Sequence, residues 1–131
     1  MKKLTFLTLA EVIEIHADQI ERYGGGSGIR DINLLFSAVA IPYASFQDQF
    51  LHADLFEMAA AYAFHICQNH PFVDGNKRTA LATALVFLEL NGISFSDPEG
   101  KLYHSMMSLA SDNLDKTGLA VVLRELKKSS R

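Results

Sequence analysis

The sequence predicts an all-α domain of about six helices, two of which lie buried at its centre. Two observations carry this prediction: the stretches 54–69 and 76–91 are apolar on nearly every side, and helix start signals recur along the chain. Helices that are apolar all round are typical of the interior of a soluble protein. With 131 residues and no linker, repeat or low-complexity segment, the chain is predicted to form one domain, 1–131.

The first helix is predicted from a capping box near the N-terminus. Thr8 and Glu11 have the spacing at which a hydroxyl and a carboxylate satisfy the free backbone N–H groups of a helix start. Apolar residues then recur along one stripe, and the glycines at 24–26 are expected to end the helix. His16 lies on this stripe, so it is predicted to be a hydrogen-bonded core residue rather than a catalyst.

The second helix is expected to begin near Asp31 and to end before Pro42, because a residue that precedes proline avoids the helical conformation. Arg30 is predicted to form a local ion pair with Asp31, which would also cap this helix. The segment Tyr43–Ala53 mixes aromatic and polar residues without a helical period, and we interpret it as a loop or short hairpin.

The two central helices are expected to pack against each other, since both carry several alanines and small side chains let helix axes approach closely. Asn91 and Gly92 would end the second of them. The segment Asp97–Glu99 is predicted to start a further helix, with Pro98 at its first position. A last helix is expected over about Lys116–Lys128.

Composition excludes several kinds of site and function. A formal net charge of −3 gives no basic footprint for nucleic acid, so no direct nucleic-acid binding is expected. The N-terminus does not resemble a signal peptide and no apolar run is long enough to cross a bilayer, so we expect a cytoplasmic protein without a membrane partner. The single cysteine, Cys67, excludes an internal disulfide, and its apolar neighbours predict a small buried side chain. The histidines lack metal-ligand spacing, so no zinc site is expected.

The turn between the two central helices breaks a rule of helix electrostatics. A helix N-terminus carries free N–H groups and about half a positive charge, which favours acidic residues there. Here the first turn holds Lys77 and Arg78 instead, at a cost of about 0.3–1 kcal/mol each if both are exposed. A bound anion would relieve this repulsion, and phosphate suits a helix N-terminus well. The sequence therefore predicts an anion site at this turn.

Four neighbours of the two cations suit nucleotide phosphate. Gly75 lets the backbone approach a ligand closely, and Asn76 can cap the helix, hold a phosphate or brace the loop. Asp74 is a hard carboxylate of the kind that holds Mg²⁺ beside phosphate oxygens. His70 is the side chain best suited to accept a proton near neutral pH. In the purely structural alternative, Asp74 or Asn76 merely caps the helix, His70 ends the preceding helix and the cations are solvated.

Residues 70–78, His-Pro-Phe-Val-Asp-Gly-Asn-Lys-Arg, resemble the signature of the Fic/Doc family, and more closely that of its death-on-curing (Doc) branch of toxins. The segments 28–38 and 87–92 are similar to this branch as well, so the resemblance covers most of the chain. It implies the helical Fic fold. It also implies a flap between the second and third helices that aligns the target segment, here expected within about Pro42–His52.

The resemblance also implies roles for most residues of the motif. His70 would be the general base that deprotonates the acceptor hydroxyl, and Asp74 would hold Mg²⁺ on the phosphates of ATP. Phe72 would anchor the loop in the core. The phosphates would be bound by the backbone around Gly75 and by Asn76, Lys77 and Arg78.

Two positions bear on the reaction that the resemblance implies. Family members that transfer AMP carry Gly where this chain has Lys77 and a second Arg where it has Leu81, whereas both residues here match Doc. The implied function is that of a kinase-like toxin, which transfers the γ-phosphate of Mg-ATP to a threonine of elongation factor Tu and arrests translation. The implied partners are this target and a cognate antitoxin. The alternatives are nucleotidyl transfer (AMPylation) to a protein hydroxyl, a catalytically inactive partner-binding module and an RNA-directed toxin.

Overall fold

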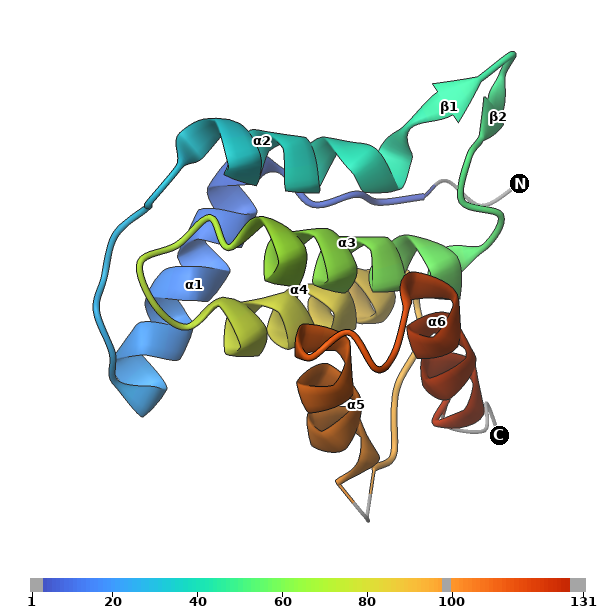
Figure 1. The fold of residues 1–131 in the computed structure, drawn as a ribbon. Coiled ribbons are helices and arrows are strands. Elements are labelled where there is room, and N and C mark those ends of the chain that lie inside the picture. Colours follow the sequence, from blue (N-terminus) through green and yellow to red (C-terminus); the bar gives the residue numbers. More distant parts are fainter. Residues whose placement is uncertain (1–3, 98–99, 128–131) are drawn as a thin grey trace.

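The computed structural model describes residues 4–97 and 100–127, which form six α-helices, a 3-10 turn and a short hairpin (Figure 1). The predicted all-α fold is therefore confirmed. Within these residues, no helix is both long and apolar enough to cross a membrane. In chain order the elements are α1 (Leu9–Tyr23), α2 (Ile32–Ala40), η1 (Ile41–Tyr43), β1 (Ser45–Phe46), β2 (Gln49–Phe50), α3 (Leu55–Asn69), α4 (Asn76–Leu90), α5 (Lys101–Ala110) and α6 (Lys116–Glu125).

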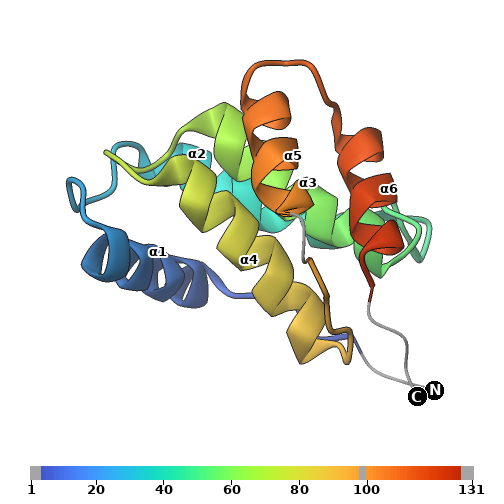
Figure 2. The same cartoon turned by 90° about the horizontal axis from the view of Figure 1, so that it is seen from below.

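Helices α3 and α4 pack against each other at the centre of the molecule, as the sequence predicts (Figure 1). Helix α2 packs against one side of α3, and helices α5 and α6 pack against the other side of α3. Helix α1 packs on α4 (Figure 2). The arrangement brings the loop between α3 and α4 to the same end of the molecule as the segment 24–31, which joins α1 to α2. Both central helices carry fully buried alanines, which are Ala59, Ala60, Ala61, Ala63, Ala80 and Ala84.

The helix starts of the N-terminal half lie where their capping residues predict. The N–H group of Glu11 donates to the Thr8 hydroxyl at 3.1 Å, and the N–H group of Thr8 donates to the Glu11 carboxylate at 2.8 Å. The capping box is therefore complete. Asp31 accepts the N–H group of Leu34 at 3.0 Å and so caps α2.

Two predicted helix bounds in the C-terminal half are wrong. Helix α5 begins at Lys101 rather than at Asp97–Glu99, although the Asp97 carboxylate accepts the N–H group of Lys101 at 2.8 Å; Pro98 and Glu99 lie outside the described residues. Helix α6 ends at Glu125 because the chain then pairs with the segment after α4, where Lys127 forms a bridge with Phe95. The rest of the expected helix, from 128 onward, lies outside the described residues.

The interpretation of 43–53 as a short hairpin is confirmed, but its expected role is not. The hairpin of β1 and β2 stands at the N-terminal end of α3, whereas the motif loop follows the C-terminal end of this helix (Figure 1). A helix of 15 residues is about 22 Å long, so the two ends are well separated. The placement of a target-aligning flap within Pro42–His52 is therefore wrong. The segment that lies along the motif loop is 24–31.

Lys116 contacts two histidines, His52 and His65, for which the sequence predicted no common partner. Lys116 Nζ lies 3.0 Å from Nε2 of His65 and 3.2 Å from Nε2 of His52. An ammonium group only donates hydrogen bonds, so both ring nitrogens accept and both imidazoles are neutral. In the part of the chain that the structure describes, no three His, Cys, Asp or Glu side chains are placed to hold a metal ion. The two hydrogen bonds of Lys116 tie α6 to α3 and to His52, which lies between the hairpin and α3.

This tie predicts a loss of stability in mild acid. Burial, and then the charge of Lys116, lower the pKa of His65 to about 4 from its ordinary value of 6.5. The unfolded chain then binds more protons than the folded one between these values, so stability is fully present above about pH 6.5 and falls as the pH drops toward 4. After allowance for solvent screening of a half-buried ring, we expect a loss of about 1–2 kcal/mol.

The measurement is urea unfolding of the wild type and of His65→Gln from pH 7.5 to 4. The variant keeps a side chain that can accept from Lys116 but cannot titrate, so its free energy of unfolding should decline less steeply than that of the wild type. Equal slopes in the two proteins would mean that His65 does not produce the acid sensitivity.

Candidate active site

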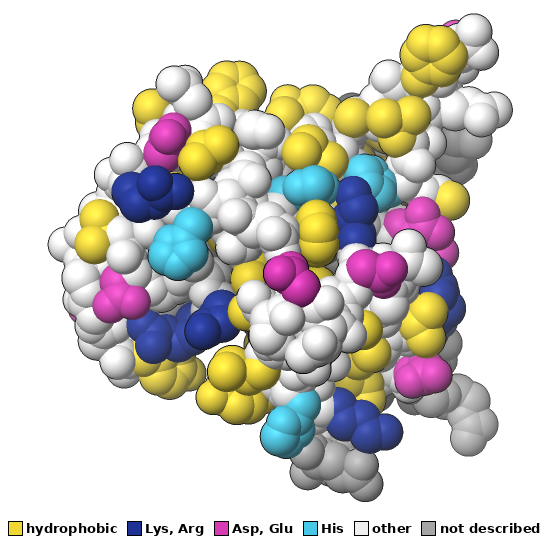
Figure 3. Space-filling view, in the orientation of Figure 1, with side chains coloured by type: hydrophobic (Ala, Val, Ile, Leu, Met, Phe, Trp, Pro, Cys, Tyr) yellow, Lys and Arg dark blue, Asp and Glu magenta, His cyan; other side chains and the backbone are white. Residues whose placement is uncertain are grey.

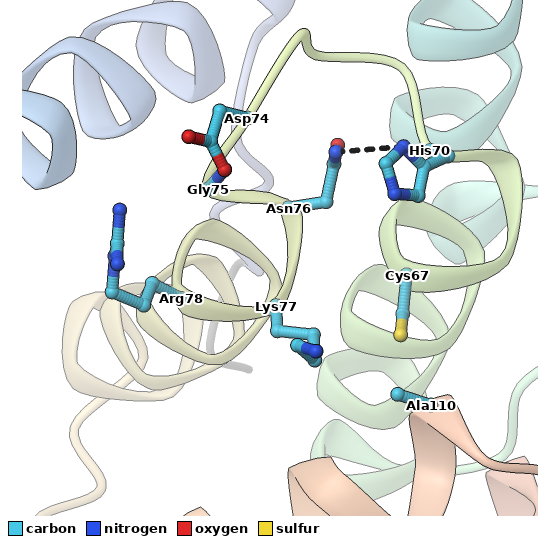
Figure 4. Close-up of a pocket in the computed structure, with 8 residues that line it drawn as sticks. All are labelled: Cys67, His70, Asp74, Gly75, Asn76, Lys77, Arg78 and Ala110. Atoms are coloured by element: carbon cyan, nitrogen blue, oxygen red, sulfur yellow. Dashed lines mark hydrogen bonds between the residues drawn. The ribbon is translucent and has the colours of Figure 1, made fainter. Parts of the chain in front are cut away.

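The residues that the sequence singled out meet around one cavity of about 340 Å³ (Figure 4). It opens between the C-terminal end of α3 and the N-terminal end of α4, where Figure 3 shows a hollow bordered by Lys and Arg side chains. Both cations of the motif line this cavity, and both side chains are exposed. The cavity is lined by Cys67, His70, Asp74, Gly75, Asn76, Lys77, Arg78 and Ala110.

His70 ends α3 in a left-handed backbone conformation. Its φ and ψ are 51° and 53°, a conformation that costs a residue with a Cβ about 1 kcal/mol. Arg30 holds the backbone here: its Nε donates to the carbonyl of His70 at 2.7 Å and its second guanidinium nitrogen to that of Asn69 at 3.0 Å. A cation suits the partial negative charge of a helix C-terminus. The predicted ion pair between Arg30 and Asp31 is therefore wrong, and Arg30 instead holds the chain at the candidate base.

The loop after His70 pairs with the segment 24–31 as two short strands would. The N–H groups of Arg30 and Asp31 both donate to the carbonyl of Pro71, at 2.7 and 3.0 Å. The N–H group of Val73 donates to the carbonyl of Gly28 at 3.1 Å. The loop thus has backbone partners on one side that fix its course past the cavity.

Phe72 anchors the loop in the core. Its ring is fully buried and stacks on the imidazole of His16, with the ring centres 3.8 Å apart and the planes 3° from parallel. His16 is buried too, and its Nε2 donates to the carbonyl of Asp74 at 2.8 Å. The prediction that His16 is a hydrogen-bonded core residue is confirmed, and its partner turns out to be the motif itself.

The side-chain amide of Asn76 holds the loop in place through both its oxygen and its nitrogen. Its Oδ1 accepts the N–H group of Phe72 at 3.0 Å, and its Nδ2 donates to the carbonyl of Phe72 and to Nδ1 of His70, both at 3.0 Å (Figure 4). The side chain is buried. Helix α4 begins at Asn76 itself, with Gly75 as the residue before it, so Asn76 is not the cap. Of the three roles open to this amide, the structure selects the brace.

The N-terminal end of α4 faces the cavity with free donors. Gly75 precedes the helix with a φ of 76°, and within the described residues no side chain caps this end. The first turn contains no acidic residue, and it presents Lys77 on the cavity side below His70 (Figure 4). Arg78 turns toward α1, where its guanidinium donates to the carbonyl of Gly24 at 2.8 Å. The predicted excess of positive charge is thus present, with Lys77 nearest to the histidine.

The carboxylate of Asp74 is oriented by backbone groups. Its Oδ2 accepts the N–H group of Gly26 at 3.2 Å and its Oδ1 that of Gly75 at 2.8 Å, and these hydrogen bonds hold the pKa of Asp74 below its ordinary value. The group is therefore ionised at neutral pH. A carboxylate has about four lone-pair sites, so two stay free for a cation. One carboxylate beside a phosphate site matches the way proteins hold Mg²⁺, which keeps several waters.

Three features of the site were missed or misjudged in the sequence. The sequence predicted an ion pair of Arg30 with Asp31, whereas Arg30 binds the carbonyl groups of Asn69 and His70. The glycine run was interpreted only as a helix stop, yet a Cβ on Gly25 would lie 2.7 Å from Oδ2 of Asp74, so this position also admits the carboxylate. Three consecutive glycines exceed what a helix end needs, and this excess was the available signal. Cys67 is only half-buried and lines the cavity, although burial still raises the pKa of its thiol.

Known proteins are similar to this chain in sequence. Residues 6–88 match the model of the Fic/DOC family. The chain is 35% identical over 117 residues to a protein of Escherichia phage P1 named "Protein kinase doc", and the match covers 88% of this chain and 90% of the relative. It is 42% identical over 74 residues to "Toxin Doc" of Mycolicibacterium smegmatis. This second match covers 56% of this chain and 57% of the relative. The motif, 70–78, lies within the residues that the family model matches.

Proposed function

The chain belongs to the Fic/DOC family, in its Doc branch, and from this premise we propose that it is a toxin that transfers the γ-phosphate of Mg-ATP to a protein hydroxyl. One observation carries the proposal. A single cavity brings together an imidazole, an ionised carboxylate, an ammonium group and the free end of a helix. Phosphoryl transfer needs mainly positioning and neutralisation of charge, and these groups can supply both.

In this proposal the charged residues of the motif divide the work of holding the nucleotide. Lys77 and the backbone N–H groups at the start of α4 bind phosphate oxygens, and Arg78 contributes those guanidinium N–H groups that Gly24 does not use. Asp74 holds Mg²⁺, which neutralises charge on the phosphates when bound. Asn76 acts through its brace and its backbone rather than through its amide.

His70 has the role of handling the proton of the acceptor hydroxyl. It is exposed at the mouth of the cavity and belongs to the end of a helix, so a hydroxyl of a protein target can approach it from solvent. The segment 24–29 lies exposed beside the loop and is the part of the chain suited to align that target, in place of the hairpin. We propose a threonine of elongation factor Tu as the acceptor, in the cytoplasm, and a cognate antitoxin as the partner that restrains the activity.

The choice of phosphoryl over nucleotidyl transfer rests on Lys77 and Leu81. A lysine in the first turn puts a long cationic side chain where a glycine would leave room, and its ammonium group stands below His70 (Figure 4). Leucine supplies no fork of donors for a second phosphate contact. Both features favour a terminal phosphate beside His70 over the α-phosphate.

Two radioactive labels separate the reactions. Purified protein is incubated with elongation factor Tu and Mg-ATP labelled at either the α- or the γ-phosphate. Label from the γ-position on the target, and none from the α-position, is the expected result. Retention of the α-label would assign nucleotidyl transfer instead. If neither label is retained while the protein still arrests growth, transfer from ATP to elongation factor Tu is not the cause of the arrest.

Lys77→Ala is expected to weaken ATP binding and to stabilise the fold at the same time. Loss of a charge-assisted contact with phosphate should raise the Kd for Mg-ATP about 10- to 100-fold. Removal of a cation from the positive end of α4 should raise the free energy of unfolding by about 0.3–1 kcal/mol. Calorimetric titration with Mg-ATP and urea unfolding measure the two effects.

Lys101→Ala is the matched control for this prediction. Lys101 occupies the first turn of α5, which also follows a glycine with positive φ, but its N–H group donates to the Asp97 carboxylate at 2.8 Å and its side chain lies outside the cavity. Its replacement should leave the Kd for Mg-ATP unchanged. A drop in affinity of equal size in both variants would show that general charge, not a contact of Lys77, attracts the nucleotide.

A further inference from the structure

The brace between Asn76 and His70 determines which nitrogen of the histidine carries its proton. The amide of Asn76 has one possible orientation, because its oxygen must face the N–H group of Phe72 and its nitrogen the carbonyl of Phe72. Both of these contacts are 3.0 Å long and buried. The group that faces Nδ1 of His70 at 3.0 Å is therefore the amide N–H, which can only donate.

A neutral imidazole has one N–H group and one lone pair. When Nδ1 accepts from Asn76, the lone pair is used there and the proton sits on Nε2. Figure 4 shows this second nitrogen at the edge of the ring that faces the space above Lys77 and Cys67. None of the hydrogen bonds in the described ranges, 4–97 and 100–127, involves Nε2. An N–H donor of the ring thus points into the cavity.

We infer that Asn76 holds His70 in the tautomer with its proton on Nε2, so that the resting site presents a hydrogen-bond donor, and not a base, to an incoming phosphate. The cavity then offers donors from His70, Lys77 and the start of α4, all suited to an anion. The lone pair that can accept a proton from a hydroxyl stays bound to the amide of Asn76. It becomes available only when the hydrogen bond between the two side chains breaks.

Asn76 is in this view a positioning residue that, in the free enzyme, keeps the basic nitrogen of His70 engaged in a hydrogen bond. The effect of the tautomer on catalysis rests on the proposed function. The test of the tautomer does not, because the tautomer can be measured in protein without nucleotide. Failure of the two-label assay would leave the tautomer assignment intact, and the reverse holds as well.

The test is a long-range proton–nitrogen correlation spectrum of ¹⁵N-labelled protein at about pH 8, where exposed imidazoles are neutral. His104, exposed on α5, is the internal reference for an unconstrained ring. The hydrogen bond from Asn76 should raise the ratio of the Nε2–H to the Nδ1–H form of His70 about fivefold above that of His104. An equal ratio, or a predominant Nδ1–H form, would overturn the inference.

Asn76→Asp tests whether this residue is the cause. A carboxylate can only accept, so the ring should now donate from Nδ1 and the tautomer of His70 should reverse, while Asn33→Asp on the exposed face of α2 should leave it unchanged. If Asn76→Asp does not fold, Asn76→Ala removes the donor without adding charge, and the ratio should fall to that of His104. A variant that folds and keeps the wild-type ratio contradicts the role of Asn76.

Discussion

Replacement of His70 by Ala is expected to lower the rate of phosphoryl transfer by about 10²–10⁴-fold, the usual contribution of a positioned acid–base group. The fold should survive, because the side chain is exposed at the end of α3 and the backbone contacts of Arg30 to this position persist. The measurement is single-turnover transfer of the γ-label at saturating ATP, with urea unfolding as a check on stability.

His104→Ala is the control for that experiment. This histidine is exposed on α5 and does not line the cavity, so its loss should leave the transfer rate unchanged. Growth assays add a second readout. Arrest of growth that persists in a folded His70→Ala protein would favour a partner-binding module over an enzyme, whatever the transfer assay detects in the wild type.

Replacement of Phe72 by Ala should destabilise the protein by about 3–5 kcal/mol, which is the usual cost of removing a fully buried aromatic ring. The ring fills the space between the motif loop and α1, where it stacks on His16 at 3.8 Å. Loss of the ring leaves a cavity beneath the loop and removes the surface on which His16 is held. Urea unfolding measures the change, and a free energy of unfolding within 1 kcal/mol of the wild type would contradict it.

The neighbouring residue provides a matched control. Val73 is 54% exposed although it belongs to the same loop, so Val73→Ala should change the free energy of unfolding by less than about 0.5 kcal/mol. Adjacent positions in one loop are thus expected to differ by several kcal/mol because one side chain enters the core and the other faces solvent.

The sequence was sufficient for the helices and the motif because these depend on local patterns. The capping box at Thr8 and the cap at Asp31 are contacts between residues three apart, and both lie where predicted. The central helices are marked by their composition alone. The motif loop could be located in the same way, since a lysine in the first turn of a helix conflicts with the helix dipole whatever surrounds it.

Contacts between distant segments could not be predicted in this way. Arg30 is 40 residues from His70, and nothing near it in the chain marks a helix end as its partner. The hairpin of β1 and β2 was recognised but assigned to the wrong end of α3, because sequence order does not say which turn lies beside which. The meeting of His52, His65 and Lys116 has the same origin.

The left-handed backbone at His70 has a consequence for how sequences of this kind can change. A residue with a side chain is held there at a disadvantage of about 1 kcal/mol, and glycine would occupy the position freely. Histidine at this position is therefore less favourable for the fold than glycine would be. In the function that we propose, glycine at this position would relieve the backbone but remove the base, so selection for activity would be needed to keep histidine there.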